Sequence, residues 1–141
     1  MDPLSLAANI AGLTSLTLEV SKFTASYIES VTNAPRESLQ LAEELSALAR
    51  ALSDLDQFLV SQNHGSMRFG NTSALVTAAT SCRDSLSMLH VTLTKLLDRT
   101  EGRKWYRRAI WPWKGPGHLK VVTALHRFTD IFHFSLSISG W

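Results

Sequence analysis

The sequence has little cysteine, proline, glycine or charge, and each shortage excludes a class of protein. With one cysteine among 141 residues, the chain cannot close an internal disulfide, which excludes a small disulfide-stapled scaffold. Four prolines and seven glycines argue against a sandwich or barrel, because those folds use many turn residues. Only 18% of the residues are charged whereas 45% are hydrophobic, a balance that excludes a disordered or collagen-like chain. We expect one domain, residues 1–141, that buries a core.

The amino terminus lacks the features of a secretory signal. Met1-Asp2-Pro3 has an acidic residue where a signal peptide has basic ones. Residues 3–18 are uncharged, but they are fewer than the roughly 20 apolar residues of a spanning helix and include several Ser and Thr. We therefore expect a cytoplasmic protein that is not secreted and that is recruited to the plasma membrane if lipid is its partner.

Four segments have apolar residues at the three- and four-residue spacing of an amphipathic helix, and none shows sustained strand alternation. Asp2 and Pro3 are a good N-cap and first helical residue, and Asn33-Ala34-Pro35 interrupts the pattern. The sequence predicts an all-α fold, an elongated four-helix-type bundle with a short basic and aromatic segment before the last helix. The expected helices span about 3–32, 35–62, 73–99 and 118–137.

The same periodicity predicts which side chains form the core. Six of them make a leucine ladder in the second helix, and Cys82 lies on the apolar stripe of the third. The predicted core positions are Leu6, Ile10, Leu13, Leu16, Val20, Phe23, Tyr27 and Val31; Leu41, Leu45, Leu48, Leu52, Leu55 and Leu59; Leu75, Ala79, Cys82, Leu86, Leu89, Leu93 and Leu96; and Leu119, Val122, Leu125, Thr129, Phe132 and Leu136.

Patterns of catalytic or metal-binding residues are missing. His126 and His133 are seven residues apart on one helix, but no cysteine or carboxylate completes a ligand set at metal spacing. There is no phosphate-binding glycine loop and no nucleophile motif, and a thiol on a core stripe behaves as a small hydrophobe. Adjacent carboxylates such as Glu43 and Glu44 indicate a solvated helix face. We expect no enzyme, no metal and no cofactor.

Positive charge gathers in the second half of the chain. Residues 1–70 hold four Lys and Arg against eight Asp and Glu, whereas residues 71–141 hold ten against four. The asymmetry indicates either an anionic partner or pairing between acidic and basic helices of one domain. The basic–aromatic segment, residues 103–114, concentrates this charge together with three of the four tryptophans. Its candidate surface residues are Arg103, Lys104, Trp105, Arg107, Arg108, Trp111, Trp113 and Lys114.

Two interpretations of the basic–aromatic segment stay open, with a third less favoured. Trp and Lys/Arg side chains suit an anionic membrane surface. Alternatively, Trp111 and Trp113 close the end of the bundle while the basic residues pair with acids of the second helix. Nucleic acid is the least favoured partner, by stacking and phosphate contact. The uncharged first helix is similarly either a core element or a releasable one, because Gly12 and the neighbouring alanines permit close helix contact in lipid.

Several motifs resemble those of one family. The opening Met1-Asp2-Pro3-Leu4-Ser5-Leu6-Ala7-Ala8-Asn9-Ile10-Ala11-Gly12-Leu13 resembles that of the fungal HeLo-like amino-terminal domains, which precede NACHT and other STAND-type modules. The family includes the amino-terminal domain of azaphilone pigment cluster protein L. Asn33-Ala34-Pro35-Arg36-Glu37, the leucine ladder and Trp111-Pro112-Trp113-Lys114 fit as well, so the resemblance covers essentially the whole chain.

The resemblance implies a helical bundle related to membrane-permeabilising domains of fungal programmed cell death. The first helix would be the membrane-active part, and Arg103, Lys104, Arg107 and Arg108 would contact anionic headgroups first. We expect a non-enzymatic signalling or cell-death-type effector that acts on an anionic membrane surface or a helical protein partner. The alternative is a structural adaptor, a homo-oligomer without membrane activity. The residues implied to enter lipid are Leu4, Leu6, Ile10, Leu13 and Leu16.

Overall fold

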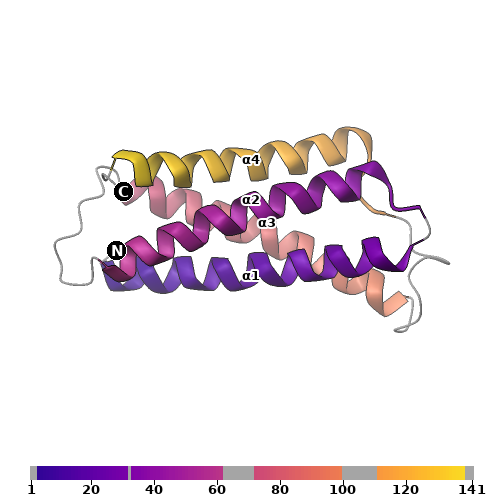
Figure 1. Cartoon of the computed structure of the whole chain (residues 1–141), viewed down its shortest axis with the longest axis horizontal. Coiled ribbons are helices and arrows are strands. Elements are labelled where there is room, and N and C mark those ends of the chain that lie inside the picture. The colour runs from indigo at the N-terminus through magenta and orange to yellow at the C-terminus, as the bar shows by residue number, and fades with distance from the viewer. Residues whose placement is uncertain (1–2, 32, 62–71, 100–110, 139–141) are drawn as a thin grey trace.

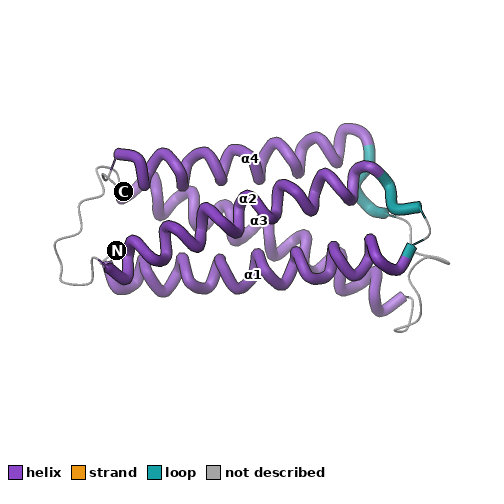
Figure 2. The backbone as a smooth tube through the Cα atoms, viewed as in Figure 1, coloured by secondary structure: helices purple, strands orange, loops and turns teal. Residues whose placement is uncertain are grey.

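The computed structural model describes residues 3–31, 33–61, 72–99 and 111–138, and these residues form an all-α bundle without strands (Figures 1 and 2). The helical periodicity of the sequence predicted this fold class, which the structure confirms. The helices of the described residues are α1 (Pro3–Ser30), α2 (Arg36–Ser61), α3 (Thr72–Arg99) and α4 (Gly115–Ile138).

The four helices lie side by side with their long axes roughly aligned (Figure 1). Successive helices run in opposite directions, so α1 is parallel to α3 and α2 is parallel to α4. α1 packs on α2 and α3, and α4 packs on the same two helices, most extensively on α2. At a rise of 1.5 Å per residue, helices of this length extend for about 40 Å, which makes the bundle elongated.

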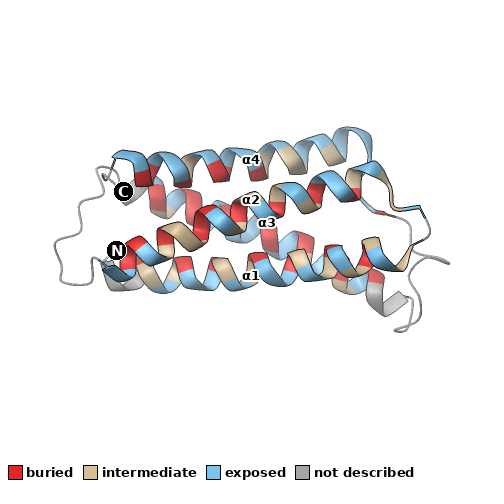
Figure 3. Ribbon diagram, viewed as in Figure 1, coloured by how far each residue is buried: buried red, intermediate tan, exposed pale blue. Residues whose placement is uncertain are grey.

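The core runs along the bundle axis and consists of one buried stripe from each helix (Figure 3). Every predicted core position of α2 and α3 is buried, because a strict three- and four-residue repeat puts all its members on one face. In α1, Thr17 and Thr24 are buried beside the apolar residues, although the sequence did not predict them as core positions.

Two expectations about α4 were wrong. Leu119, a predicted core residue, is 65% exposed, because it lies on the outward face of α4 with Thr123 and Arg127 and not on the stripe of Leu125, Phe132 and Leu136 that packs on α2 and α3. The helix also starts three residues earlier than expected. Gly115 has a φ of +53°, a left-handed conformation that glycine adopts without strain, and the Gly117 amide then donates to the Lys114 carbonyl at 3.1 Å.

The turn between α1 and α2 follows the predicted break. Pro35 precedes the first residue of α2, and its carbonyl accepts a hydrogen bond from the Ser38 amide at 2.9 Å. The Ser38 hydroxyl donates to the same carbonyl at 2.6 Å, which satisfies this buried side chain within the first turn. The proline thus fixes the backbone where α2 begins.

Candidate interaction surfaces

The apolar face of α1 lies in the core. Leu6, Ile10 and Leu13 are each at most 1% exposed, and Leu16 is half-buried; the side chain of Leu4 lies outside the described residues. Full burial of an aliphatic side chain is worth about 1.5–3 kcal/mol. Contact of these side chains with lipid therefore requires α1 to leave the bundle.

Three threonine hydroxyls of α1 are satisfied within the helix itself, whereas the buried Ser21 Oγ has no hydrogen-bond partner among the described residues. Thr14 donates to the Ile10 carbonyl at 2.9 Å, and Thr17 donates to the Leu13 carbonyl at 2.8 Å. The buried Thr24 repeats the pattern with the carbonyl of Val20 at 2.9 Å. A hydrogen bond to the carbonyl four residues earlier satisfies a buried hydroxyl, so its burial needs no partner on another helix. These three side chains of α1 therefore need no polar partner on α2 or α3.

Two polar contacts join α1 to α3 among the described residues. Arg83 Nη2 donates to Asn9 Oδ1 at 3.0 Å and lies 3.4 Å from the Asn9 carbonyl oxygen. His90 Nε2 is 3.5 Å from Glu19 Oε1, an ion-pair separation that leaves this nitrogen without a hydrogen bond among the described residues. Exposed pairs of this kind contribute about 0–1 kcal/mol each, so apolar burial dominates the attachment of α1.

Two tryptophans close one end of the bundle. Trp111 is 1% exposed and packs edge-on against Trp113, with ring centroids 5.2 Å apart. Tyr27, near the end of α1, lies 4.8 Å from Trp111 between ring centroids. Burial raises the pKa of the Tyr27 hydroxyl, because the charged phenolate is poorly solvated there. The geometry of Trp111 and Trp113 supports the interpretation in which they pack against the bundle.

The remainder of the basic–aromatic segment stays a prediction. Arg103, Lys104, Trp105, Arg107 and Arg108 lie outside the described residues. Lys114, immediately before α4, is exposed.

Cys82 is buried in the core, as the sequence predicted. Desolvation raises the pKa of its thiol to about 12, so the reactive thiolate is scarcely populated at neutral pH. The burial of Cys82 and the raised pKa of its thiol therefore suit a structural role.

In the described parts of the chain, no group of three or more His, Cys, Asp or Glu side chains is arranged to hold a metal ion.

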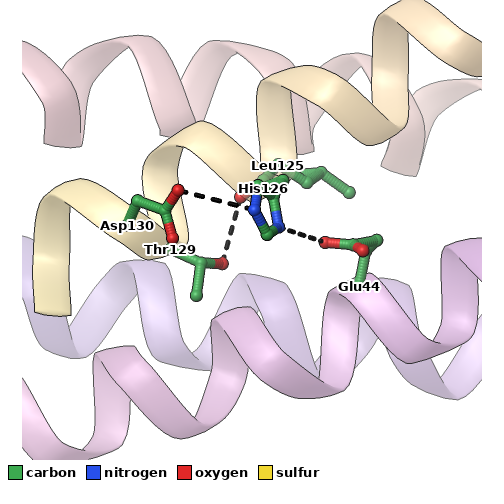
Figure 4. Close-up of polar contacts among 5 residues, drawn as sticks. All are labelled: Glu44, Leu125, His126, Thr129 and Asp130. Atoms are coloured by element: carbon green, nitrogen blue, oxygen red, sulfur yellow. Dashed lines mark hydrogen bonds and ion pairs between the residues drawn. The ribbon is translucent and has the colours of Figure 1, made fainter.

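His126 connects α4 to α2 on the surface (Figure 4). Its Nδ1 lies 3.5 Å from Glu44 Oε1, and its Nε2 lies 3.5 Å from Asp130 Oδ2. The imidazole is 64% exposed, and the adjacent buried Thr129 donates to the Leu125 carbonyl at 3.0 Å. Because the histidine faces solvent, this arrangement is a weak polar contact between the surfaces of α4 and α2.

The chain matches the family model of the pigment biosynthesis cluster protein PigL N-terminal domain over residues 1–111. It belongs to this family. The match confirms the resemblance to the azaphilone pigment cluster domain, and it covers α1, α2 and α3 and ends at Trp111, before α4. No curated protein and no solved structure matches the chain.

No helix among the described residues of this PigL N-terminal domain is long and apolar enough to cross a membrane.

The outward side of α4 carries exposed apolar residues, of which sequence analysis placed Leu119 in the core and left Phe134 and Ile138 unassigned. Leu119 is 65% exposed, Phe134 64% and Ile138 50%. An open apolar groove of about 410 Å³ runs beside Phe134 and Ile138, between α3 and α4. The sequence did contain a signal for this surface, because Phe134 and Ile138 are apolar but do not belong to the predicted core stripe of this helix. The groove is lined by Ala74, Arg127, Asp130, Ile131, Phe134, Ser135 and Ile138.

Proposed function

We propose that this PigL N-terminal domain is a non-catalytic, HeLo-like signalling domain of a fungal protein that acts in cell death through contact with membranes. Membership of the family and the all-α bundle support the domain type. The grooves between α3 and α4 are open and mostly apolar, which suits contact with another molecule better than chemistry. The proposal extends to NACHT- or STAND-type proteins as the setting of the domain.

The observation that carries the membrane proposal is the composition and bonding of α1. Its first half, residues 3–18, is uncharged, and the hydroxyls of Thr14 and Thr17 bond to carbonyls of their own helix. A helix with these properties exposes no unsatisfied hydroxyl of Thr14 or Thr17 when it moves from the bundle into lipid. Its apolar face would lie in the headgroup boundary as an interfacial helix.

The energetics indicate how α1 would be released. Exposing the side chains of α1 that the core buries would cost on the order of 10 kcal/mol in water. Each basic residue near an anionic surface supplies only about 1 kcal/mol, so Arg103, Lys104, Arg107 and Arg108 would dock the domain without releasing the helix. Burial of the same apolar face in lipid would offset the rest of the free-energy cost of removing α1 from the bundle. We therefore propose a cytoplasmic domain that is recruited to the plasma membrane before α1 inserts.

The test uses a charge placed in α1 where the folded bundle tolerates it. Ala11 is exposed, so Ala11→Glu leaves the core intact but puts a carboxylate in the middle of the uncharged stretch. Near an anionic lipid surface, a carboxylate on α1 is repelled by roughly as much free energy as a basic residue is attracted, about 1 kcal/mol. Ser87→Glu, at an exposed position of α3, is the matched control.

Vesicle flotation and dye leakage measure the effect, with anionic vesicles compared against zwitterionic ones. We expect leakage from anionic vesicles with wild type and the control, and a loss of leakage with Ala11→Glu. Unchanged far-UV circular dichroism would show that the variant is folded. Equal leakage by both variants, or no binding by wild type, would contradict the membrane proposal.

A second candidate is a structural adaptor that binds a helical protein partner and has no membrane activity. The exposed Leu119 and Phe134 of α4 favour it, because an apolar surface on an outer helix suits protein contact. An adaptor would leave vesicles intact at every lipid composition.

A further inference from the structure

We infer that the outward face of α4 binds a second copy of this chain, with the two α4 helices antiparallel. The first observation is the low charge of α4. It carries three Lys, Arg, Asp or Glu side chains among 24 residues, whereas α2 carries seven among 26. A helix with a solvated outer face normally gathers charge there. The low charge of α4 fits an outer face that another molecule covers in part.

The outward face has a symmetric pattern along the sequence. Six exposed residues follow one another at steps of four, four, three, four and four, which keeps them on one side of an α-helix. This series of spacings reads the same from either end of the helix. Two antiparallel copies of α4 therefore bring their stripes into register when the midpoints of the two stripes face each other. The stripe consists of Leu119, Thr123, Arg127, Asp130, Phe134 and Ile138.

In this antiparallel register, the charges at the midpoint of one stripe face opposite charges of the other. A parallel arrangement with the two stripes aligned does not achieve this. Arg127 lies opposite Asp130 of the second copy, and the two-fold symmetry repeats the pair. A parallel alignment would place Arg127 against Arg127 and Asp130 against Asp130, which is repulsive. Asp130 Oδ2 is 3.5 Å from His126, and its other oxygen can accept hydrogen bonds from an arginine of the second copy.

The apolar residues on either side of the charges also fit. Phe134 lies opposite Thr123 of the second copy, a large side chain against a small one, which is the pairing that allows two helices to interdigitate. Leu119 and Ile138 come to the same level at the two ends of the interface. The groove of about 410 Å³ beside Phe134 and Ile138 extends the apolar surface toward α3. A second copy would therefore cover a surface wider than one helix.

This inference does not depend on the proposed membrane function, and its test can fail separately. Static light scattering after size exclusion, over a concentration series of the full chain without lipid, should give twice the monomer mass of 15.6 kDa. Phe134→Glu should return the mass to that of the monomer. Val91→Glu, at a 51% exposed apolar position of α3, is the control and should remain dimeric.

A charge exchange tests the register. Arg127→Asp puts two acids in each stripe and Asp130→Arg puts two arginines there, so each variant alone should be monomeric. An equimolar mixture of the two variants should form a heterodimer, and the double variant with both exchanges should dimerise again. Rescue of this kind requires direct contact between positions 127 and 130 of different copies.

Circular dichroism would show that each variant is folded, since all the changed side chains are exposed. The inference is overturned if wild type is monomeric throughout the series, if Phe134→Glu stays dimeric, or if the mixture of charge variants does not associate. A monomeric wild type whose vesicle binding is lost on Phe134→Glu would assign the face to lipid, which also overturns it. Loss of leakage by Ala11→Glu with dimerisation intact would leave both proposals standing.

Discussion

The ring of Tyr27 lies 4.8 Å from the ring of Trp111 between centroids, tilted by 43°, and this contact ties the end of α1 to the segment that leads into α4. Trp113 also packs against Trp111, with ring centroids 5.2 Å apart. The aromatic cluster therefore connects the end of α1 with the segment that leads into α4. The end of α1 and the start of α4 lie at the same end of the bundle (Figure 1). Because the cluster is buried, we expect it to contribute to the free energy of unfolding, which can be measured.

Trp111→Ala should lower the free energy of unfolding by about 3–5 kcal/mol, because it removes a fully buried aromatic side chain and leaves a cavity. Trp111→Phe retains part of the packing and should cost less. Urea denaturation monitored by circular dichroism measures both. A loss below about 1 kcal/mol for the alanine variant would show that the cluster contributes little to the bundle.

Adjacent residues on α4 should differ sharply in their effect on stability. Leu125 is fully buried, so Leu125→Ala should cost about 2–5 kcal/mol. His126 contacts Glu44 and Asp130, but it is 64% exposed and solvent screens both contacts, so His126→Ala should cost less than about 1 kcal/mol. Equilibrium unfolding compares the two variants. A histidine variant as unstable as the leucine variant would show that the contact drawn in Figure 4 holds α4 in place.

Gly12→Ala should stabilise the fold by about 0.5–1 kcal/mol. Gly12 lies inside α1, where glycine is less favourable than alanine by that amount. A Cβ at this position would meet Arg83 Nη2 at 3.4 Å, and the end of a flexible exposed side chain can move slightly. Thermal unfolding would register the gain as a higher midpoint. A lower midpoint would mean that Arg83 cannot move without losing its contact with Asn9.

Cys82 should make stability fall at high pH. Its pKa is raised by burial from 9.0 to about 12, so the unfolded state loses the thiol proton first as the pH rises. The stabilisation is complete below pH 9 and is lost between pH 9 and about 12, at up to about 1.4 kcal/mol per pH unit. Comparing wild type with Cys82→Ala across this range separates the thiol from other titrating groups. Parallel pH profiles for the two proteins would contradict the prediction.

The core of the bundle was predictable because its spacing is regular. All six ladder leucines of α2, from Leu41 to Leu59, are buried, since residues three and four apart fall on one face of any α-helix. Local chemistry also predicted the boundary at Pro35. The burial of Thr17 and Thr24 was not predicted, because a hydroxyl side chain indicates an exposed position unless its hydrogen bond to the carbonyl four residues earlier is known.

The candidate surfaces were less predictable. Leu119 satisfies the helical spacing of a core residue, yet it is exposed, because the stripe of α4 that is covered depends on how α2 and α3 are placed around it. Trp111 and Trp113 suited either a membrane surface or a packed end, and their proximity to Tyr27 is a contact between distant parts of the chain. No local pattern encodes such a contact.

The amino-acid sequence by itself determined the helices, their apolar stripes and the all-α class, because helix formation and amphipathicity depend on residues within a few positions of one another. The tertiary structure decided which stripe faces which neighbour, that the apolar face of α1 is buried, and that Phe134 and Ile138 of α4 face outward. These properties follow from the packing of four helices, in which each helix covers only part of the surface of the next.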